Sequence, residues 1–334
     1  MTPITRVVSG MRPTGKLHLG HLVGALQNWV ALQARYDCFY FVADWHALTT
    51  DYADTSELRK NIRELALDFL AVGLDPNRST LFVQSHVPVH AELHLLLSMV
   101  VPLPWLERVP TYKEQIEQLR EKELNTYGFL GYPLLQSADI LVYRADFVPV
   151  GEDQKPHVEL TREIARRFNN FYGNVLTEPD VKLTRTPKLP GTDGRKMSKS
   201  YGNTIGLAED EASVRGKLKT MMTDPARKRR TDPGDPAKCP VFDLHKVFST
   251  EKTRAWASEG CRTAGIGCIE CKSALADHLV SHLEPIAKRR HEYERRPDDV
   301  RDIFVAGAGR AGEVAESTMA DVREAVKLPP MGSL

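Results

Sequence analysis

The first half of the chain alternates between short apolar runs and longer segments in which apolar residues recur with helical spacing. Residues 6–11, 38–44 and 79–85 consist mainly of apolar and β-branched residues, and they predict buried strands. Residues 21–36 and 55–73 carry apolar stripes at three- and four-residue intervals, and they predict helices between those strands. This order predicts a parallel sheet covered on both faces, the Rossmann-like α/β architecture.

The alternation stops after about residue 203. Residues 272–296 and 309–328 instead show long helical patterns of mixed polar and apolar positions. We therefore predict a Rossmann-like domain over residues 1–203 and an all-helical domain over residues 204–334, with the C-terminal helix packing back on the first domain.

Composition agrees with a globular protein of about two domains. The 334 residues are 42% hydrophobic and 27% charged, and the net charge of +1 excludes a general binder of polyanions. No apolar run is long enough to span a bilayer, and the N-terminus lacks the apolar core of a signal peptide. We expect a cytoplasmic protein without membrane attachment, in which structural disulfides are not favoured.

Positive charge is concentrated in the second half. Residues 215–230 contain seven Lys or Arg and a single acid, and residues 287–296 form a second basic stretch. Two interpretations remain open for these stretches, a solvated helix face and a surface that contacts nucleic acid.

The link between the first strand and the first helix carries two histidines around a glycine, His18, Gly20 and His21. Nucleotides bind α/β sheets at such links, where a strand ends and a helix begins. The spacing is not the dinucleotide glycine fingerprint, so we exclude a dehydrogenase. Gly20 lets a nucleotide approach the backbone, and two imidazoles donate hydrogen bonds to phosphate oxygens. Two ordinary surface histidines are the alternative.

A glycine-rich loop with two lysines, GTDGRKMSKSYGNT (residues 191–204), ends the same domain. Lys196 and Lys199 would bring two positive charges to a triphosphate, and Ser198 and Ser200 would add hydroxyl donors. A mobile loop is suited to closing over ATP and opening for product release. A flexible basic linker is the alternative, but the two motifs together are far more specific than either one.

The pair of motifs resembles the signature of class I aminoacyl-tRNA synthetases. GYPLLQSADILVY (residues 131–143) and VPVGEDQKPHVELTREIARRF (residues 148–168) resemble the tryptophanyl-tRNA synthetase family in particular, over essentially the whole chain. The chain is most similar to the bacterial branch that carries an iron–sulfur cluster. A tyrosyl-tRNA synthetase and a synthetase-like paralogue that binds RNA or protein without charging tRNA are the alternatives.

The resemblance implies a tryptophan–tRNA ligase that activates L-tryptophan with ATP and transfers it to tRNA(Trp). It also implies Mg²⁺ with the ATP, a homodimer, and no binding of DNA. The carboxylate of the substrate attacks the α-phosphorus itself, so the protein supplies positioning and charge stabilisation rather than a nucleophile.

Asp139 is the single carboxylate of an apolar helical segment. A buried carboxylate needs a donor, and an indole N–H is one, whereas a phenyl ring has none. The resemblance gives Asp139 this role, places Tyr132 and Gln154 near the α-amino group of tryptophan, and adds Gln136 and Gly10 to the tryptophan site. A carboxylate paired with a neighbouring Arg or Lys is the alternative.

The resemblance further implies that His18 and His21 stabilise the α-phosphate and that Lys196 and Lys199 draw pyrophosphate away. Arg12 stands where many bacterial relatives have Gln, and for Lys113 a solvated helix face is favoured over an ATP contact. The expected ATP-binding set is Arg12, Pro13, Thr14, Gly20, His21, Gly151, Glu152, Asp153, Lys196, Met197, Ser198, Lys199 and Ser200.

Two further groups of residues have metal-ligand spacing. His86, His90 and His94 recur every four residues, but Pro88 interrupts the helix there and a metal site is not favoured.

Four of the five cysteines gather in the second domain, and a Cys₄ site would hold a [4Fe–4S] cluster or zinc. The single close C-x2-C pair is unlike a zinc ribbon, and the spacing resembles the cluster motif of the branch named above, so the cluster is favoured. Four unrelated core cysteines are the other alternative. The expected ligands are Cys239, Cys261, Cys268 and Cys271, whereas Cys38 is expected in the core.

Overall fold

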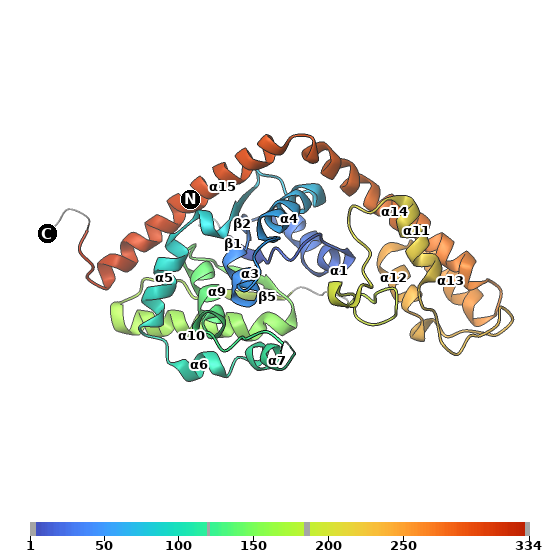
Figure 1. Ribbon diagram of the computed structural model, residues 1–334, viewed down its shortest axis with the longest axis horizontal. Coiled ribbons are helices and arrows are strands. Elements are labelled where there is room, and N and C mark those ends of the chain that lie inside the picture. The colour runs from blue at the N-terminus through green and yellow to red at the C-terminus, as the bar shows by residue number, and fades with distance from the viewer. Residues whose placement is uncertain (1–4, 119–120, 184–187, 331–334) are drawn as a thin grey trace.

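The computed structural model describes residues 5–118, 121–183 and 188–330. Within these residues the centre of the molecule is a five-stranded parallel sheet with the order β3-β2-β1-β4-β5 (Figure 1). The strands are β1 (Arg6–Met11), β2 (Asp37–Val42), β3 (Ser79–Val83), β4 (Phe147–Val150) and β5 (Asp180–Leu183). The three strands predicted from apolar runs are therefore confirmed, and β4 and β5 extend the sheet beyond them.

Helices cover the sheet and build the second half of the chain. In the first half they are α1 (Leu19–His21), the π-helical turn η1 (Leu22–Leu26), α2 (Gln27–Leu32), α3 (Asp44–Asp51), α4 (Leu58–Val72), η2 (Gln84–His86), α5 (Val89–Ser98), α6 (Leu103–Glu107), α7 (Pro110–Gln118), α8 (Tyr127–Leu130), α9 (Tyr132–Leu141), η3 (Glu152–Gln154) and α10 (Lys155–Tyr172). Further along the chain are η4 (Lys199–Tyr201), α11 (Glu211–Thr220), η5 (Pro236–Lys238), α12 (Pro240–Phe248), α13 (Glu251–Arg262), α14 (Cys268–Glu294) and α15 (Pro297–Ala325).

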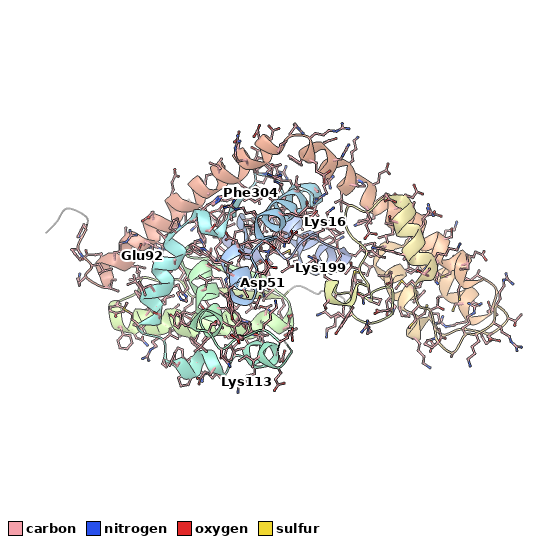
Figure 2. All side chains as sticks on the ribbon, in the orientation of Figure 1. Lys16, Asp51, Glu92, Lys113, Lys199 and Phe304 are labelled. Atoms are coloured by element: carbon pink, nitrogen blue, oxygen red, sulfur yellow. The ribbon has the colours of Figure 1, made fainter. Side chains whose placement is uncertain are left out.

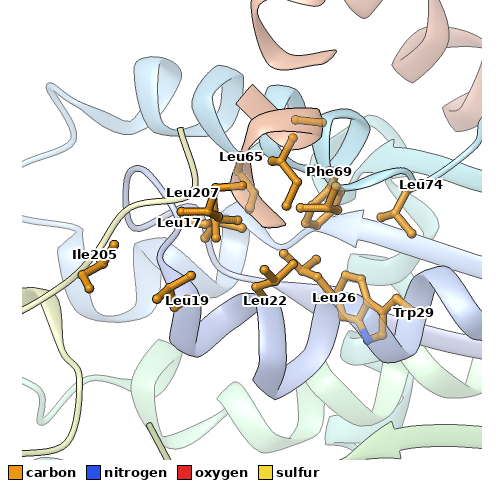
Figure 3. Packing of buried hydrophobic residues seen from close by; sticks show 14 of the residues in the cluster. Leu17, Leu19, Leu22, Leu26, Trp29, Leu65, Phe69, Leu74, Ile205 and Leu207 are labelled. Carbon is orange, nitrogen blue, oxygen red and sulfur yellow. The ribbon is translucent and has the colours of Figure 1, made fainter. Parts of the chain in front are cut away.

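Apolar side chains fill both faces of the sheet. Val7 and Val8 are neighbours in β1, and because side chains alternate along a strand they join different cores. One core contains Trp29 and Phe69, together with apolar side chains of α14, and part of it appears in Figure 3. The other core lies among α5, α9, α10 and α15. The predicted α/β fold with a helical C-terminal region is thus confirmed.

The last helix, α15, runs back from the helical half and packs along the edge strand β3 (Figure 1). Gly307 lies at the crossing, where a Cβ atom would stand 1.8 Å from the carbonyl oxygen of Leu81. A side chain at this position would force the helix away from the strand. The close approach covers an edge that would otherwise present unpaired backbone groups.

Part of the second basic stretch joins the two halves of the chain. Arg290 on α14 is 2% exposed and forms ion pairs with Glu64 and Asp68 of α4. Its neighbour Arg289 donates to the carbonyl oxygen of Ala71 at 2.6 Å. Arg290 therefore belongs to neither a solvated helix face nor a surface for nucleic acid, whereas both interpretations stay open for the exposed residues of the stretch. In the described part of the chain, no helix has the length and apolarity needed to cross a membrane.

Candidate active site

A cavity opens at the carboxyl ends of β1 and β4, where the strand order of the sheet reverses. This reversal is where open α/β sheets bind their ligands. Residues of both strands line the cavity, and side chains of α3, α9 and the start of α10 complete it. The residues predicted to bind tryptophan all line it, namely Gly10, Tyr132, Gln136, Asp139 and Gln154.

Asp139 lies at the wall of this cavity and is 1% exposed. Its Oδ1 accepts a hydrogen bond from Gln84 Nε2 at 2.7 Å and lies 2.6 Å from His90 Nδ1, and its Oδ2 lies 2.8 Å from His46 Nε2. Burial alone would raise the pKa of Asp139, but the hydrogen bonds from His46 and His90 outweigh it, so the pKa lies below its ordinary range. The carboxylate is therefore ionised and is an acceptor only.

A second polar group lines the same cavity, around Tyr132 at the start of α9. The hydroxyl of Tyr132 lies 2.7 Å from Thr111 Oγ1 and 3.2 Å from His157 Nε2, and Thr111 Oγ1 lies 3.0 Å from the same ring nitrogen. Burial lowers the pKa of His157 to about 4, so the ring is neutral at pH 7. This group, with Gln154 at the start of α10, offers oxygen acceptors suited to an ammonium group.

The two histidines of the first motif are folded against the start of α1. His18 Nδ1 accepts from the backbone N–H of Gly20 at 3.1 Å, and His21 Nδ1 accepts from the backbone N–H of His18 at 3.3 Å. Burial, with the nearby charge of Lys199, lowers the pKa of His18 to about 4. Burial, then His18 and Lys199, lowers the pKa of His21 to about 3. Both rings are therefore neutral with the proton on Nε2, which leaves each Nε2–H as a donor.

Gly20 is required by local packing as well as by the close approach of a nucleotide that the sequence suggests. A Cβ at this position would lie 2.8 Å from Cε1 of the His18 ring. The absence of a side chain therefore allows the His18 ring to fold back over the helix start.

The lysine loop reaches across to the first motif. Lys199 Nζ donates to the carbonyl oxygens of Thr14 and Gly15, both at 2.9 Å. Burial lowers the pKa of Lys199 to about 8, and Asp68 partly opposes this shift. Two signature motifs separated by about 180 residues thus meet at one end of the sheet.

Asn203 organises this loop from within, and the sequence did not single it out. It is buried, its Oδ1 accepts from the backbone N–H of Ser198 at 2.8 Å, and its Nδ2 donates to Asp193 at 2.7 Å. Met197 points into the core, whereas Lys196 and Ser200 are exposed. The hydroxyls of Ser198 and Ser200 lie 2.9 Å apart.

Arg12 enters the cavity from the loop after β1. It donates to Thr50 Oγ1 and lies 3.8 Å from Asp51 Oδ2, both at the end of α3. Its Nε is buried without a hydrogen-bond partner in the described residues. A buried guanidinium N–H without an acceptor is suited to an anionic ligand.

The remaining predicted ATP residues lie in two loops at the same end of the sheet. Pro13 is buried and Thr14 is exposed beside Lys199. Gly151 lines the cavity at the end of β4, and Glu152 and Asp153 follow it as exposed residues. Lys113 lies on the exposed helix α7, and Figure 2 shows it well apart from Lys199.

The three regularly spaced histidines have different environments. His86 is exposed, His94 is partly buried, and His90 is fully buried against Asp139. Within the described ranges, no group of three or more His, Cys, Asp or Glu side chains has an arrangement that would hold a metal ion.

The cysteines predicted as ligands lie at or beside the ends of helices in the second half, and the charges of Cys239, Cys261 and Cys268 act on the thiol of Cys271. Cys239 precedes α12, Cys261 is near the end of α13, and Cys268 and Cys271 are in the first turn of α14. Burial, then the neighbouring thiols, raises the pKa of Cys271 to about 12. Cys38 is fully buried in β2, as predicted. The thiols thus lie near one another, but the metal site is not confirmed.

Two buried cations accompany these thiols. Arg227 Nη1 lies 3.8 Å from Cys261 Sγ, and its Nη2 donates to the carbonyl oxygen of Ile266 at 2.7 Å. Lys272 is also buried, and its pKa is lowered by burial and partly restored by Cys268, Cys239 and Cys271. Nearby negative charge stabilises a buried cation; Asp224 provides it for Arg227, and metal-bound thiolates would add to it.

Several site residues were not predicted because their signals are not local. His46, Thr111 and His157 line the cavity, yet each comes from a different part of the chain. Gln84 and His90 reach Asp139 from the segments after β3. The sequence offered one signal, the regular spacing of His86, His90 and His94, for which a metal site was considered but not favoured.

Comparison with known proteins agrees with this geometry. A sequence profile described as tRNA synthetases class I (W and Y) matches residues 2–284. The chain therefore belongs to the class I tRNA synthetases of the tryptophan and tyrosine group.

Individual relatives indicate which amino acid the enzyme attaches to tRNA. The tryptophan–tRNA ligase of Thermotoga maritima is 56% identical, with 97% of this chain and 99% of that protein covered. The tryptophan–tRNA ligase of Ralstonia nicotianae is 50% identical, with 97% and 98% covered. The crystal structure of a tryptophanyl-tRNA synthetase from Campylobacter jejuni, complexed with ADP and tryptophan, has a TM-score of 0.88 at 32% identity, with 97% and 100% covered. The chain is thus an enzyme with the activity of a tryptophan–tRNA ligase, and the tyrosine alternative is set aside.

Proposed function

We propose that this cytoplasmic enzyme selects tryptophan through one open acceptor position of Asp139. A carboxylate has about four acceptor positions. Gln84 and His90 occupy two on Oδ1, and His46 occupies one on Oδ2. The remaining position on Oδ2 fits the indole N–H, and this is the observation that carries the proposal. Tyr132 and Gln154 would receive the α-amino group, with Gln136 and Gly10 beside the ring.

In the first step, a carboxylate oxygen of tryptophan attacks the α-phosphorus of ATP, and the bond from that phosphorus to the bridging oxygen breaks. Tryptophanyl-adenylate forms and pyrophosphate leaves. His18 and His21 would donate their Nε2–H groups to the α-phosphate oxygens, and Lys196 and Lys199 would neutralise the departing pyrophosphate. Mg²⁺ would share the charge of the phosphates. The remaining residues of the predicted ATP set would hold the nucleotide, with Arg12 directed at an anionic group.

In the second step, a hydroxyl of the terminal ribose of tRNA(Trp) attacks the acyl carbon of the adenylate, and AMP leaves. We propose that the helical half contacts the anticodon arm. The exposed residues Lys228, Arg229 and Arg230 support this proposal, because phosphate contacts supply much of the affinity for nucleic acid.

We further propose that Cys239, Cys261, Cys268 and Cys271 hold a [4Fe–4S] cluster. The convergence of four thiols and the burial of Arg227 and Lys272 beside them support an anionic centre of this kind. The cluster would tie α12, α13 and α14 together and takes no part in aminoacyl transfer.

Metal analysis of protein purified without oxygen tests the cluster. We expect brown protein with about four irons per chain. About one zinc per chain in colourless protein would replace the cluster with a zinc site, and four titratable thiols without metal would contradict both.

A homodimer is proposed from an exposed apolar surface on α5 and its neighbours. Leu95, Met99, Leu103 and Tyr127 are exposed, and Met99 reaches 70%. Apolar surface of this kind commonly marks a protein interface. Sedimentation of the wild type should show a dimer and of Met99→Asp a monomer, whereas Val305→Asp, an exposed residue of α15, should leave the dimer intact.

ATP–pyrophosphate exchange tests the proposed amino-acid selection. We expect exchange with L-tryptophan and none above background with L-tyrosine. Asp139→Ala should raise the KM for tryptophan far more than that for ATP. Unchanged discrimination against tyrosine and phenylalanine in this variant would remove Asp139 from the role.

A further inference from the structure

Asp139 does not stand alone, because a chain of buried hydrogen bonds leads away from it. His90 is 0% exposed and bridges two groups, with Nδ1 2.6 Å from Asp139 Oδ1 and Nε2 2.6 Å from the hydroxyl of Tyr143. Tyr143 is itself fully buried and stacks on Phe39, with ring centroids 4.9 Å apart. The carboxylate is thus connected through an imidazole to a phenol.

The direction of each hydrogen bond follows from the partners. Burial, then the charge of Asp139, raises the pKa of Tyr143 well above its ordinary value, so the phenol keeps its proton. A buried hydroxyl needs an acceptor, and the partner that the structure describes for it is His90 Nε2. Tyr143 therefore donates to His90 Nε2, which leaves Nδ1–H of the ring as the donor to Asp139.

A second donor to the same oxygen is fixed in a similar way. Gln84 is fully buried, and its Oε1 accepts from the backbone N–H of Trp45 at 3.2 Å. This contact sets the orientation of the amide, so Nε2 must face Asp139 Oδ1, which it reaches at 2.7 Å. Both acceptor positions of Oδ1 are thereby filled by donors whose own orientation is set elsewhere.

We propose that His90, oriented by Tyr143, is a positioning residue that determines specificity for the indole N–H. The inference rests on the proposed role of Asp139. By filling Oδ1, His90 and Gln84 prevent rotation of the carboxylate, so the open position on Oδ2 stays directed into the cavity. A ligand without an N–H then leaves that buried position unpaired and is rejected.

The proposal predicts a change in selectivity rather than in activity alone. L-tryptophan is compared with its benzothiophene isostere, in which sulfur replaces the indole N–H and cannot donate. If His90 is lost, the carboxylate rotates and tryptophan loses part of its hydrogen bond. The isostere makes no such bond and keeps its kcat/KM, so the ratio of the two kcat/KM values falls.

The test is ATP–pyrophosphate exchange with both amino acids on purified full-length variants. His90→Leu should lower the ratio by about 10-fold, on the scale of one hydrogen bond to a charged group. His90→Asn places an amide nitrogen near the position of Nδ1 and should restore most of the ratio. Tyr143→Phe removes a single oxygen and should lower the ratio about threefold. His86→Asn, an exposed histidine of the same series, is the matched control.

Each outcome separates this proposal from the one on which it rests. A ratio in His90→Leu equal to that of the wild type would overturn the role of His90. If that variant does not fold, an unchanged ratio in Tyr143→Phe would overturn it instead. A wild type that does not prefer tryptophan over the isostere would contradict the role of Asp139, and with it this inference. Loss of the preference in Asp139→Asn but in none of the His90 and Tyr143 variants would leave Asp139 in place and reject the positioning residues.

Discussion

His18 and His21 act as neutral donors because the fold fixes both their charge and their tautomer. Each Nδ1 accepts a backbone N–H, and burial holds the pKa of both rings well below 7. A phosphate bound near these rings would therefore accept hydrogen bonds from two neutral Nε2–H groups. The histidines therefore act as hydrogen-bond donors, and the lysines carry the positive charge of the site.

Lys199 should make ATP binding depend on pH. Because burial lowers its pKa to about 8, the ammonium group is present below pH 8 in the free enzyme and is lost above it. The KM for ATP should therefore rise several-fold between pH 7 and pH 9, measured by exchange at saturating tryptophan. Lys199→Arg stays charged over this range and should flatten the rise. An equal rise in both proteins would assign the titration to another group.

At the level of single residues, the sequence predicted the residues expected to contact the substrates better than the residues that fix the positions of those side chains. The two signature motifs identify their histidines and lysines directly. Asn203 and Gln84 act through contacts with residues distant in the chain or hidden in a loop, and no local pattern marks such contacts. The histidine series was not favoured as a metal site, but spacing alone does not reveal that His90 faces Asp139.

Elements in the first half follow the apolar pattern because each packs one face on the sheet. The predicted helix at residues 55–73 corresponds to α4 (Leu58–Val72), and the strands fall within two residues of the predicted ranges. The predicted helix at residues 21–36 ends earlier, at Leu32. Strands β4 and β5 have four residues each, too few for a reliable apolar pattern.

The close contact between α15 and β3 can be tested by substitution of Gly307. Gly307→Ala should lower the free energy of unfolding by about 1–3 kcal/mol, because the new methyl group overlaps the carbonyl of Leu81. Gly309→Ala is the control two residues away, where a Cβ meets no atom within 4 Å. It should be neutral or stabilise by up to about 1 kcal/mol. Denaturant unfolding measures both, and equal effects would contradict the close crossing.

The two halves of the molecule are joined at a point that also touches the first motif. Asp68 receives Arg290 from the helical half and the backbone N–H of Leu17, at 2.9 Å, from the residue before His18. Contacts of the helical half are thereby linked to the position of His18. The sequence predicted a division near residue 203, but a link of this kind depends on three distant segments and no local pattern contains it.

Replacement of Arg290 should therefore affect both stability and catalysis. Arg290→Gln leaves Asp68 buried without its cation, which should cost about 3–5 kcal/mol of unfolding free energy. The kcat of adenylate formation should fall about 10-fold, on the scale of one misplaced donor to the phosphate, with the KM for tryptophan little changed. Arg295→Gln, an exposed residue of the same basic stretch, should change neither. A changed KM for tryptophan with an unchanged kcat would argue against this link.

Aminoacylation of a tRNA(Trp) transcript by the purified protein tests the central claim most directly. With ATP and L-tryptophan, the wild type should charge the transcript, and with L-tyrosine it should not. Asp139→Ala should lose most of its preference for tryptophan, while the exposed control Glu163→Gln should keep it. Charging with tyrosine, or no charging of this tRNA by an otherwise folded protein, would contradict the account.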